Sequence, residues 1–143
     1  MSDHNIMNWQ PLIEAAKQAA DRAYAPYSKF HVGAAAMTDN GNVVKGCNVE
    51  NASYGLTVCA ERNCISHGIV NGEQRFSAMV IYTGQEILTP PCGACRQVIA
   101  EFLEPAAPIM AVNHLNQQKV WTVKQLLPDA FTPQNLIDHN KNS

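Results

Sequence analysis

The chain has 143 residues, of which 46% are hydrophobic and 15% are charged, and its formal net charge is -2. This length and composition indicate one globular domain, residues 1–143, that is long enough to bury a single core. No apolar run approaches the roughly 20 residues that cross a bilayer, and no cluster of Lys and Arg supplies the positive surface of a nucleic-acid-binding protein. We therefore expect a small-molecule substrate, and neither a membrane nor a nucleic acid as partner.

The N-terminus and the cysteines bear on the cellular compartment. Residues 1–5 lack the basic stretch and the apolar core of a secretory signal. The chain has 5 cysteines, an odd number, and three of them have metal-like spacing, so a disulfide framework explains them poorly. Reduced thiols fit a cytoplasmic location, which we expect for this protein.

The first predicted element is a helix that begins near Trp9. Asn8 can cap its N-terminus, and Pro11 stands in its first turn, where the missing N–H has no consequence. Apolar residues recur at helical spacing and form a stripe along one side: Leu12, Ile13, Ala16, Ala20 and Ala23. We expect the dipeptide Ala25-Pro26 to end this helix.

Two strands, residues 30–37 and 42–48, are expected to follow as a hairpin. The turn at residues 39–42 (DNGN) joins them and makes them antiparallel. Alternate residues of the first strand are apolar and should share one face of the sheet: Phe30, Val32, Ala34 and Ala36.

The rest of the chain alternates between helices and strands. An irregular stretch follows the hairpin and passes through Tyr54. The elements expected after it are, in chain order, a helix at 59–70, a strand at 76–82, a loop at 83–91, a helix from 92 or 93 to about 103, a strand at 109–112 and a short strand at 120–121. Helices between strands require parallel crossovers. The predicted fold class is therefore α/β, a three-layer α/β/α arrangement with a mixed sheet of about five strands. Residues from about 132 onward are polar and are expected to form a loosely held tail.

Three cysteines lie at the starts of the second and third predicted helices. Cys92 and Cys95 are three residues apart, so both lie on one side of a first helical turn, while Cys59 begins the other helix. The exposed N–H groups and the positive end of the helix dipole favour the thiolate form that Zn²⁺ requires. Three protein ligands leave the fourth tetrahedral position open, which is typical of a catalytic zinc site. We expect one Zn²⁺ per chain.

Glu61 and two arginines stand next to these cysteines in the sequence. Glu61 lies two residues beyond Cys59 and can move protons between a water at the open position and a leaving amine, so hydrolytic deamination is the expected chemistry. Three thiolates leave a Zn²⁺ site with one excess negative charge, which weakens the ion as a Lewis acid. Arg62 and Arg96 directly follow the two motifs, and we expect both guanidinium groups to donate to sulfur and restore the acidity of the water.

At these residues the chain resembles cytidine deaminases, specifically the small homotetrameric type with three cysteine ligands. The likeness rests on six blocks that occur in the same order along most of the chain: 25–30 (APYSKF), 32–35 (VGAA), 46–52 (GCNVENA), 59–62 (CAER), 91–97 (PCGACRQ) and 126–131 (LLPDAF). The resemblance implies a cytidine deaminase-like fold, zinc on Cys59, Cys92 and Cys95, and Glu61 as the proton shuttle.

The resemblance also implies a nucleoside pocket that neighbouring subunits complete. Asn48 and Glu50 are two residues apart at the end of the second strand, and an amide with a carboxylate suits the hydroxyls of a ribose. By the same resemblance, Phe30 packs on the pyrimidine and the backbone of Ala60 reads the base. Neighbouring subunits contribute three further residues, namely Ala52, Tyr54 and Phe131. The expected assembly is a homotetramer with shared active sites.

Several of these residues also have ordinary structural explanations. Phe30 and Phe131 can be core aromatics, and Asn48 and Glu50 can simply end a strand. Tyr54 can be an interface residue without a role in the site. A lone Cys-x-x-Cys pair is more often a structural zinc site or a redox pair, but such a site has no use for a neighbouring glutamate.

The function expected from the sequence is zinc-dependent hydrolytic deamination of cytidine and deoxycytidine, which yields uridine or deoxyuridine and ammonia, in pyrimidine salvage. One alternative is a deaminase of a related cytosine nucleoside such as blasticidin S. An alternative from another class is a zinc-stabilised binding module without turnover, and the intact Glu61 argues against it. A deaminase that edits polynucleotides is disfavoured by the acidic net charge.

Overall fold

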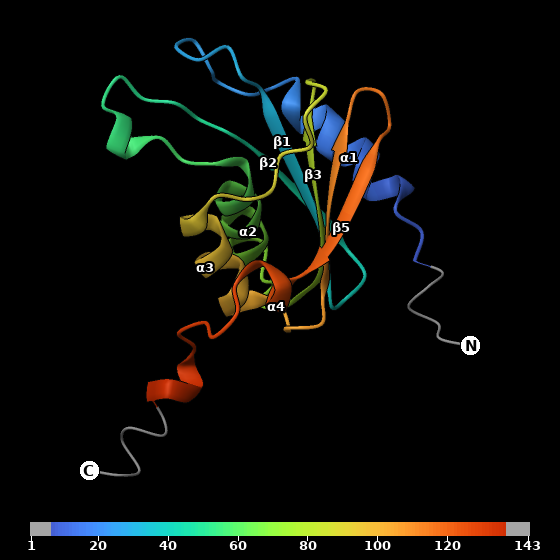
Figure 1. Ribbon diagram of the computed structural model, residues 1–143, viewed down its shortest axis with the longest axis vertical. Coiled ribbons are helices and arrows are strands. Elements are labelled where there is room, and N and C mark those ends of the chain that lie inside the picture. Colours follow the sequence, from blue (N-terminus) through green and yellow to red (C-terminus); the bar gives the residue numbers. More distant parts are fainter. Residues whose placement is uncertain (1–6, 137–143) are drawn as a thin grey trace.

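The computed structural model describes residues 7–136; the N-terminal residues 1–6 and the end of the predicted tail, residues 137–143, lie outside the described residues. Within the described range, five strands form one sheet in the order β2-β1-β3-β4-β5 (Figure 1). The strands are β1 (Val32–Thr38), β2 (Val43–Cys47), β3 (Phe76–Thr83), β4 (Pro108–Asn113) and β5 (Gln118–Thr122). The β3–β4 pair is parallel and the other pairs are antiparallel, which confirms the predicted hairpin and the mixed sheet.

Helices cover both faces of this sheet, which confirms the predicted three layers (Figure 1). The helix α1 (Gln10–Ala20) packs on one face against β1, β2 and β3. The opposite face carries α2 (Ala60–Val70), α3 (Gly93–Phe102) and the short α4 (Val123–Leu126). A 3-10 turn, η2 (Tyr54–Leu56), lies in the segment between β2 and α2. None of the helices in residues 7–136 has the length and apolar character that crossing a bilayer requires.

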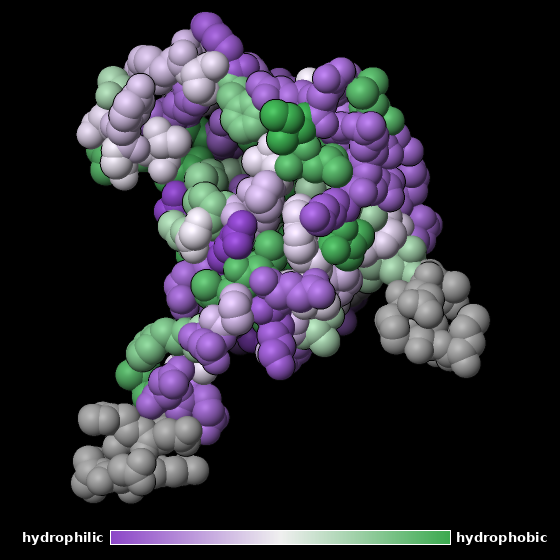
Figure 2. Space-filling model, viewed as in Figure 1, coloured by the Kyte–Doolittle hydropathy of each residue, from purple (hydrophilic) through white to green (hydrophobic). Residues whose placement is uncertain are grey.

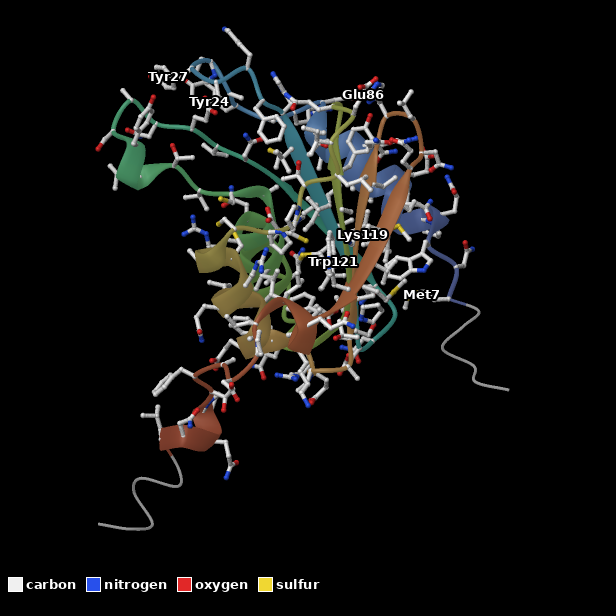
Figure 3. The ribbon with its side chains drawn as sticks, in the orientation of Figure 1. Met7, Tyr24, Tyr27, Glu86, Lys119 and Trp121 are labelled. Atoms are coloured by element: carbon white, nitrogen blue, oxygen red, sulfur yellow. The ribbon has the colours of Figure 1, made fainter. Side chains whose placement is uncertain are left out.

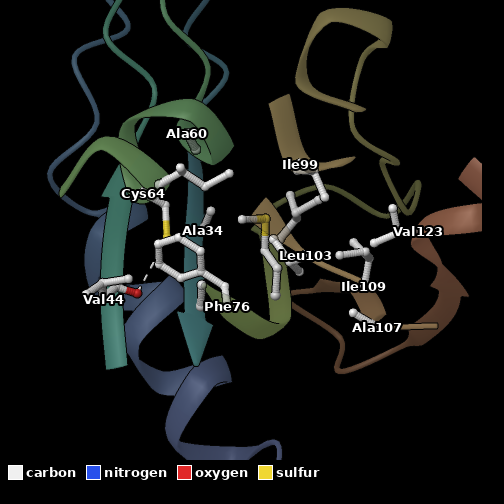
Figure 4. Packing of buried hydrophobic residues seen from close by; sticks show 14 of the residues in the cluster. Ala34, Val44, Ala60, Cys64, Phe76, Ile99, Leu103, Ala107, Ile109 and Val123 are labelled. Atoms are coloured by element: carbon white, nitrogen blue, oxygen red, sulfur yellow. Dashed lines mark hydrogen bonds between the residues drawn. The ribbon is translucent and has the colours of Figure 1, made fainter. Parts of the chain in front are cut away.

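Alternation along β1 divides the core between the two helical layers. Ala34 and Ala36 face α2 and α3 and pack in a cluster with Phe76. Figure 4 shows Ala34 and Phe76 in this cluster. Ala35 faces α1 and packs in a second cluster with Leu12. Such two-sided burial explains why β1 contains small apolar residues at successive positions. The predicted shared face of Val32, Ala34 and Ala36 is confirmed.

Two glycines let helices approach the sheet closely. A Cβ atom at Gly33 would collide with the carbonyl oxygen of Ala16 in α1, and a Cβ at Gly46 would collide with the backbone nitrogen of Cys64 in α2. Only glycine permits this backbone contact without a shift of the helix. Gly46 therefore helps to set the distance between β2 and α2, the helix that begins at the cysteine and glutamate motif.

The first helix ends five residues earlier than the sequence predicted. It stops at Ala20, and Tyr24 instead pairs with the chain after β2: its N–H donates to Asn48 O at 3.0 Å, and its carbonyl accepts from Glu50 N at 2.8 Å (Figure 3). Because these tertiary hydrogen bonds need an extended backbone at Tyr24, the helix cannot continue to Pro26. The last predicted apolar residue of the stripe, Ala23, lies outside the helix.

The C-terminal part also differs in detail from the prediction. The fifth strand is longer than the two residues expected, and α4 was not predicted. Thr122 and Gln125 form a reciprocal capping box that begins α4, with Gln125 N donating to Thr122 Oγ1 at 3.1 Å. Beyond this helix, residues 132–136 extend away from the sheet (Figure 1). Their loose attachment stays a prediction.

Candidate functional site

The three predicted metal ligands lie together at the N-terminal ends of α2 and α3. Cys59 and Cys92 each occupy the position just before a helix, and Cys95 lies in the first turn of α3. Their sulfur atoms all lie within 4.8 Å of one another, with 3.9 Å between Cys59 and Cys92 and 3.4 Å between Cys92 and Cys95. Two loops that are far apart in the sequence thus place three sulfur atoms around one point.

The spacing of these sulfur atoms fits a tetrahedral zinc ion. Two thiolates that bind one tetrahedral Zn²⁺ at about 2.3 Å lie about 3.8 Å from each other. The separations of 3.4 and 3.9 Å are close to this value. Among residues 7–136, the group holds three sulfur donors and no fourth protein ligand, which is the donor set of an open site. The residues therefore fit zinc, as the sequence predicted.

Hydrogen bonds within the cluster divide the charge between the thiols. The pKa of Cys59 is lowered to about 5, first because the Cys95 thiol donates to it and second because Arg62 donates from 3.8 Å. The pKa of Cys95 is raised because its proton serves that hydrogen bond and because the side chain is buried. These contacts favour the thiolate form of Cys59. A divalent cation favours ionisation of the remaining thiols.

Glu61 is a buried carboxyl group in the first turn of α2, with 5% of its surface exposed. Burial raises its pKa to about 7, and the negative charge of Cys59 adds to this effect. A carboxyl group with a pKa near the working pH exchanges protons in both directions, which is the property of a general acid and base. The geometry places this group beside the sulfur cluster, since Glu61 and Cys59 line the same cavity.

The two arginines differ in what they contact. Arg62 donates from Nη2 to Cys59 Sγ at 3.8 Å, as predicted. Arg96 does not donate to sulfur, and that prediction is wrong: its Nε donates to Pro91 O at 2.7 Å and its Nη1 to Leu126 O at 3.0 Å. The Leu126 carbonyl reaches the guanidinium group because α4 lies against α3. Arg96 therefore fixes the backbone just before Cys92.

A cavity of about 340 Å³ lies over the metal site. Seven of the predicted site residues line it together: Phe30, Asn48, Glu50, Cys59, Ala60, Glu61 and Cys92. In Figure 2 the outline of the molecule recedes between the projecting segment 49–58 and the helices α2 and α3. One cavity therefore joins two of the clustered cysteines, the carboxyl of Glu61 and the residues predicted for a nucleoside.

The amide of Asn48 and the carboxylate of Glu50 also hold the neighbouring loop in place. Asn48 Oδ1 accepts from Val32 N at 3.0 Å, and its Nδ2 donates to Phe30 O at 2.8 Å. Glu50 Oε1 accepts from the N–H groups of Tyr27 at 3.0 Å and Ser28 at 3.1 Å. These bonds leave each side chain with part of its hydrogen-bonding capacity, so both can still meet a ligand in the cavity.

The three residues predicted to reach a neighbouring subunit's site lie on the surface. Tyr54 is 87% exposed and Phe131 is 60% exposed, and Ala52 is exposed as well. None of the three lines the cavity of its own chain in the described structure. Their contribution to a site between subunits stays a prediction.

Beyond the seven predicted residues, six others line the cavity: Ser28, Val32, Thr57, Ile81, Thr89 and Pro90. Ser28 lies within one of the six motif blocks, so its position there was an available signal. Thr89 and Pro90 precede the motif that begins at Pro91, but they lie in an irregular loop, and periodicity does not predict the side-chain directions of such a loop.

Comparison with known proteins places this fold and site in a family. A model of the "Cytidine and deoxycytidylate deaminase zinc-binding region" matches residues 7–111. The chain is 42% identical to a cytidine deaminase of Sporosarcina psychrophila, over 91% of this chain and 96% of that protein. It is 44% identical to a cytidine deaminase of Mycobacterium tuberculosis, over 87% of this chain and 90% of that protein.

Solved structures agree with the sequence comparisons. The crystal structure of a cytidine deaminase from Burkholderia pseudomallei matches with a TM-score of 0.83 at 46% identity, and the match covers 87% of this chain and 100% of that one. The matched segment of the family model includes all three clustered cysteines and the buried Glu61. The chain therefore belongs to the cytidine deaminase family.

Proposed function

We propose that this protein hydrolyses cytidine and deoxycytidine to uridine and deoxyuridine, with release of ammonia, in cytoplasmic pyrimidine salvage. The observation that carries the proposal is the buried Glu61 beside three clustered sulfur atoms in one cavity. The names of the related proteins support the choice of substrate. One zinc ion per chain would be held by Cys59, Cys92 and Cys95.

The chemistry follows from where the protons must go. When bound, zinc supplies the Lewis-acid chemistry that makes water a nucleophile near neutral pH. Glu61 accepts a proton at a carboxylate oxygen as the water oxygen bonds to C4 of the cytosine ring, and it delivers that proton to N3. It then transfers the second water proton to the amino group, the C4–N bond breaks, and ammonia leaves. Burial raises the pKa of Glu61 to about 7, so this carboxyl group can both accept and donate a proton near neutral pH.

The rest of the cavity suits the nucleoside. Phe30 is partly buried against the core cluster and offers a ring face for the pyrimidine. The backbone of Ala60, at the start of α2, reads the base. Asn48 and Glu50 use their remaining hydrogen-bonding capacity for ribose hydroxyls.

Neighbouring subunits of a homotetramer would complete the site. The exposed side chains of Tyr54 and Phe131, together with Ala52, are available to another copy of the chain. Large exposed aromatic side chains are typical of surfaces that bind other proteins. An active site shared between chains would make the enzyme depend on its assembly.

A deamination assay that monitors the ultraviolet absorbance of the nucleoside tests the substrate class. The purified protein should convert cytidine and deoxycytidine, with release of one ammonia per nucleoside. Conversion of blasticidin S without conversion of either nucleoside would assign the site to a different cytosine nucleoside. A zinc-loaded protein that converts none of the three would identify a binding module without turnover.

A further inference from the structure

Ser28 lies in the loop that leads into β1 and lines the same cavity as Glu50. The next residue, Lys29, has a positive φ of 62°. Few residues other than glycine adopt this backbone conformation readily, so the surrounding contacts must hold it. Figure 3 shows Tyr27, the preceding residue, at the outer end of this loop. The position of the Ser28 hydroxyl is therefore closely determined.

The hydroxyl of Ser28 connects Glu50 with the backbone of Phe30. Its oxygen accepts the N–H of Phe30 at 3.0 Å, and its hydrogen is donated to Glu50 Oε2. The other carboxylate oxygen, Oε1, accepts the N–H groups of Tyr27 and Ser28 at 3.0 and 3.1 Å. Because a hydroxyl has a single hydrogen, which Ser28 donates to Glu50, the Ser28 oxygen can act only as an acceptor toward the N–H of Phe30.

These contacts determine what Glu50 can still accept. An ionised carboxylate has about four acceptor positions, and the three donors of the loop fill all but one of them. The Ser28 hydroxyl is the largest cause of the lowered pKa of Glu50, with further lowering from the two backbone N–H groups. Glu50 is thus held as a carboxylate that has a single acceptor position left for a ligand.

We infer that Ser28 is a positioning residue: it orients the Glu50 carboxylate so that the one open acceptor position receives a sugar hydroxyl of the nucleoside. This inference rests on the proposed function, in which Glu50 binds the ribose. Ser28 itself touches Glu50 and the loop, so it acts on substrate affinity through Glu50. Its loss should raise KM and leave kcat nearly unchanged, because Glu61 and the sulfur cluster remain in place.

The test compares three variants of the full chain with cytidine as substrate. Ser28→Ala removes the hydroxyl and should raise KM about tenfold, the size expected for the loss of one hydrogen bond to a charged group. Ser28→Thr retains the hydroxyl and should restore a KM near that of the wild type. Ser77→Ala is the matched control, since the Ser77 hydroxyl donates to Met37 O at 3.4 Å and Ser77 does not line the cavity.

A double variant separates action through Glu50 from a general effect on the loop. Adding Ser28→Ala to Glu50→Gln should raise KM little beyond the Glu50→Gln value, since the residue through which Ser28 acts is already changed. Fully additive effects would overturn the inference, and so would an unchanged KM in Ser28→Ala. A wild-type protein without cytidine turnover would overturn the proposed function and this inference with it.

Discussion

Glu61 and Arg62 are adjacent in the sequence but differ in what their surroundings do to them. Glu61 is buried, so its pKa rises to about 7, and the carboxyl group can exchange protons near neutral pH. Arg62 places its guanidinium group 3.8 Å from Cys59 Sγ, where it draws charge from the sulfur. One turn of α2 therefore supplies both the proposed proton carrier and a positive charge beside the sulfur cluster.

We predict that Arg62→Gln lowers kcat by about tenfold to 100-fold, in the range seen when groups that orient or polarise metal ligands are removed. Glutamine retains a donor but no positive charge, so the sulfur atoms hold more negative charge and zinc becomes a weaker Lewis acid. The measurement is steady-state turnover at pH 7 on protein of known zinc content. Arg22→Gln, at an exposed position outside the cavity, is the control. An unchanged kcat in Arg62→Gln with zinc retained would refute this role.

Sequence spacing predicted well that Cys59, Cys92 and Cys95 come together, because the helix fixes much of their geometry. Cys92 and Cys95 lie on one side of a helical turn in any α-helix, and Glu61 follows Cys59 within one turn. The contact of Arg96 could not be predicted in this way. Its partner Leu126 O comes from α4, thirty residues further along the chain, and the packing of α4 against α3 decides that contact.

At the scale of elements, the metal site depends on how closely α2 approaches β2. Gly46 permits this approach, because any Cβ there would collide with the backbone of Cys64. The N-terminal end of the same helix carries Glu61 and follows Cys59. A change in the strand can therefore displace the site without altering any residue that lines the cavity.

We predict that Gly46→Ala destabilises the protein by about 1–3 kcal/mol, the usual effect of an added methyl in a close-packed interior, and also weakens zinc binding. The methyl group pushes against backbone, which cannot rotate away as a side chain can. Thermal unfolding and competition with a zinc chelator measure the two effects. Gly84→Ala is the control, since a Cβ there meets nothing within 4 Å. Wild-type stability and zinc affinity in Gly46→Ala would contradict this account of the packing.

The elements themselves were largely predictable because hydrophobic periodicity and turn residues marked them. The hairpin, the sheet and the three long helices agree with the sequence, and the departures occur where long-range contacts decide the outcome. Tyr24 leaves the helical conformation to pair with Asn48 and Glu50, which the local sequence does not indicate. The capping box of α4 at Thr122 was visible in the sequence as a Thr-x-x-Gln pattern, but the helix is too short for periodicity to reveal.

At the scale of the whole molecule, apolar side chains remain exposed around the segment between β2 and α2. The exposed residues of this segment and its surroundings are Tyr24, Tyr27, Val49, Tyr54 and Leu56, and Phe131 is exposed near the C-terminal end. Contact with other copies of the chain would remove this surface from water, which favours association. The proposed homotetramer gives two of them, Tyr54 and Phe131, a place in neighbouring active sites.

We predict that two impaired variants restore activity when they assemble together. Glu61→Ala lacks the proton carrier, and Phe131→Ala lacks the ring proposed to reach a neighbouring site. A mixed assembly contains sites with Glu61 from one chain and Phe131 from the other. Refolding the two variants together should therefore give more activity than the sum of the activities of the two variants refolded separately. Activity equal to that sum would contradict shared sites, and sedimentation would show whether the mixture still assembles.

The most direct test of the central claim is turnover of cytidine by Glu61→Gln, compared with the wild type at equal zinc content. Glutamine has nearly the same size as glutamate but cannot carry the proton, whereas the three cysteines remain to bind zinc. We predict that each chain retains about one zinc ion and that kcat falls by about 100-fold to 10,000-fold, the range of general acid and base catalysis. Turnover within tenfold of the wild type, with zinc retained, would contradict the assignment of Glu61 as the group that moves the protons.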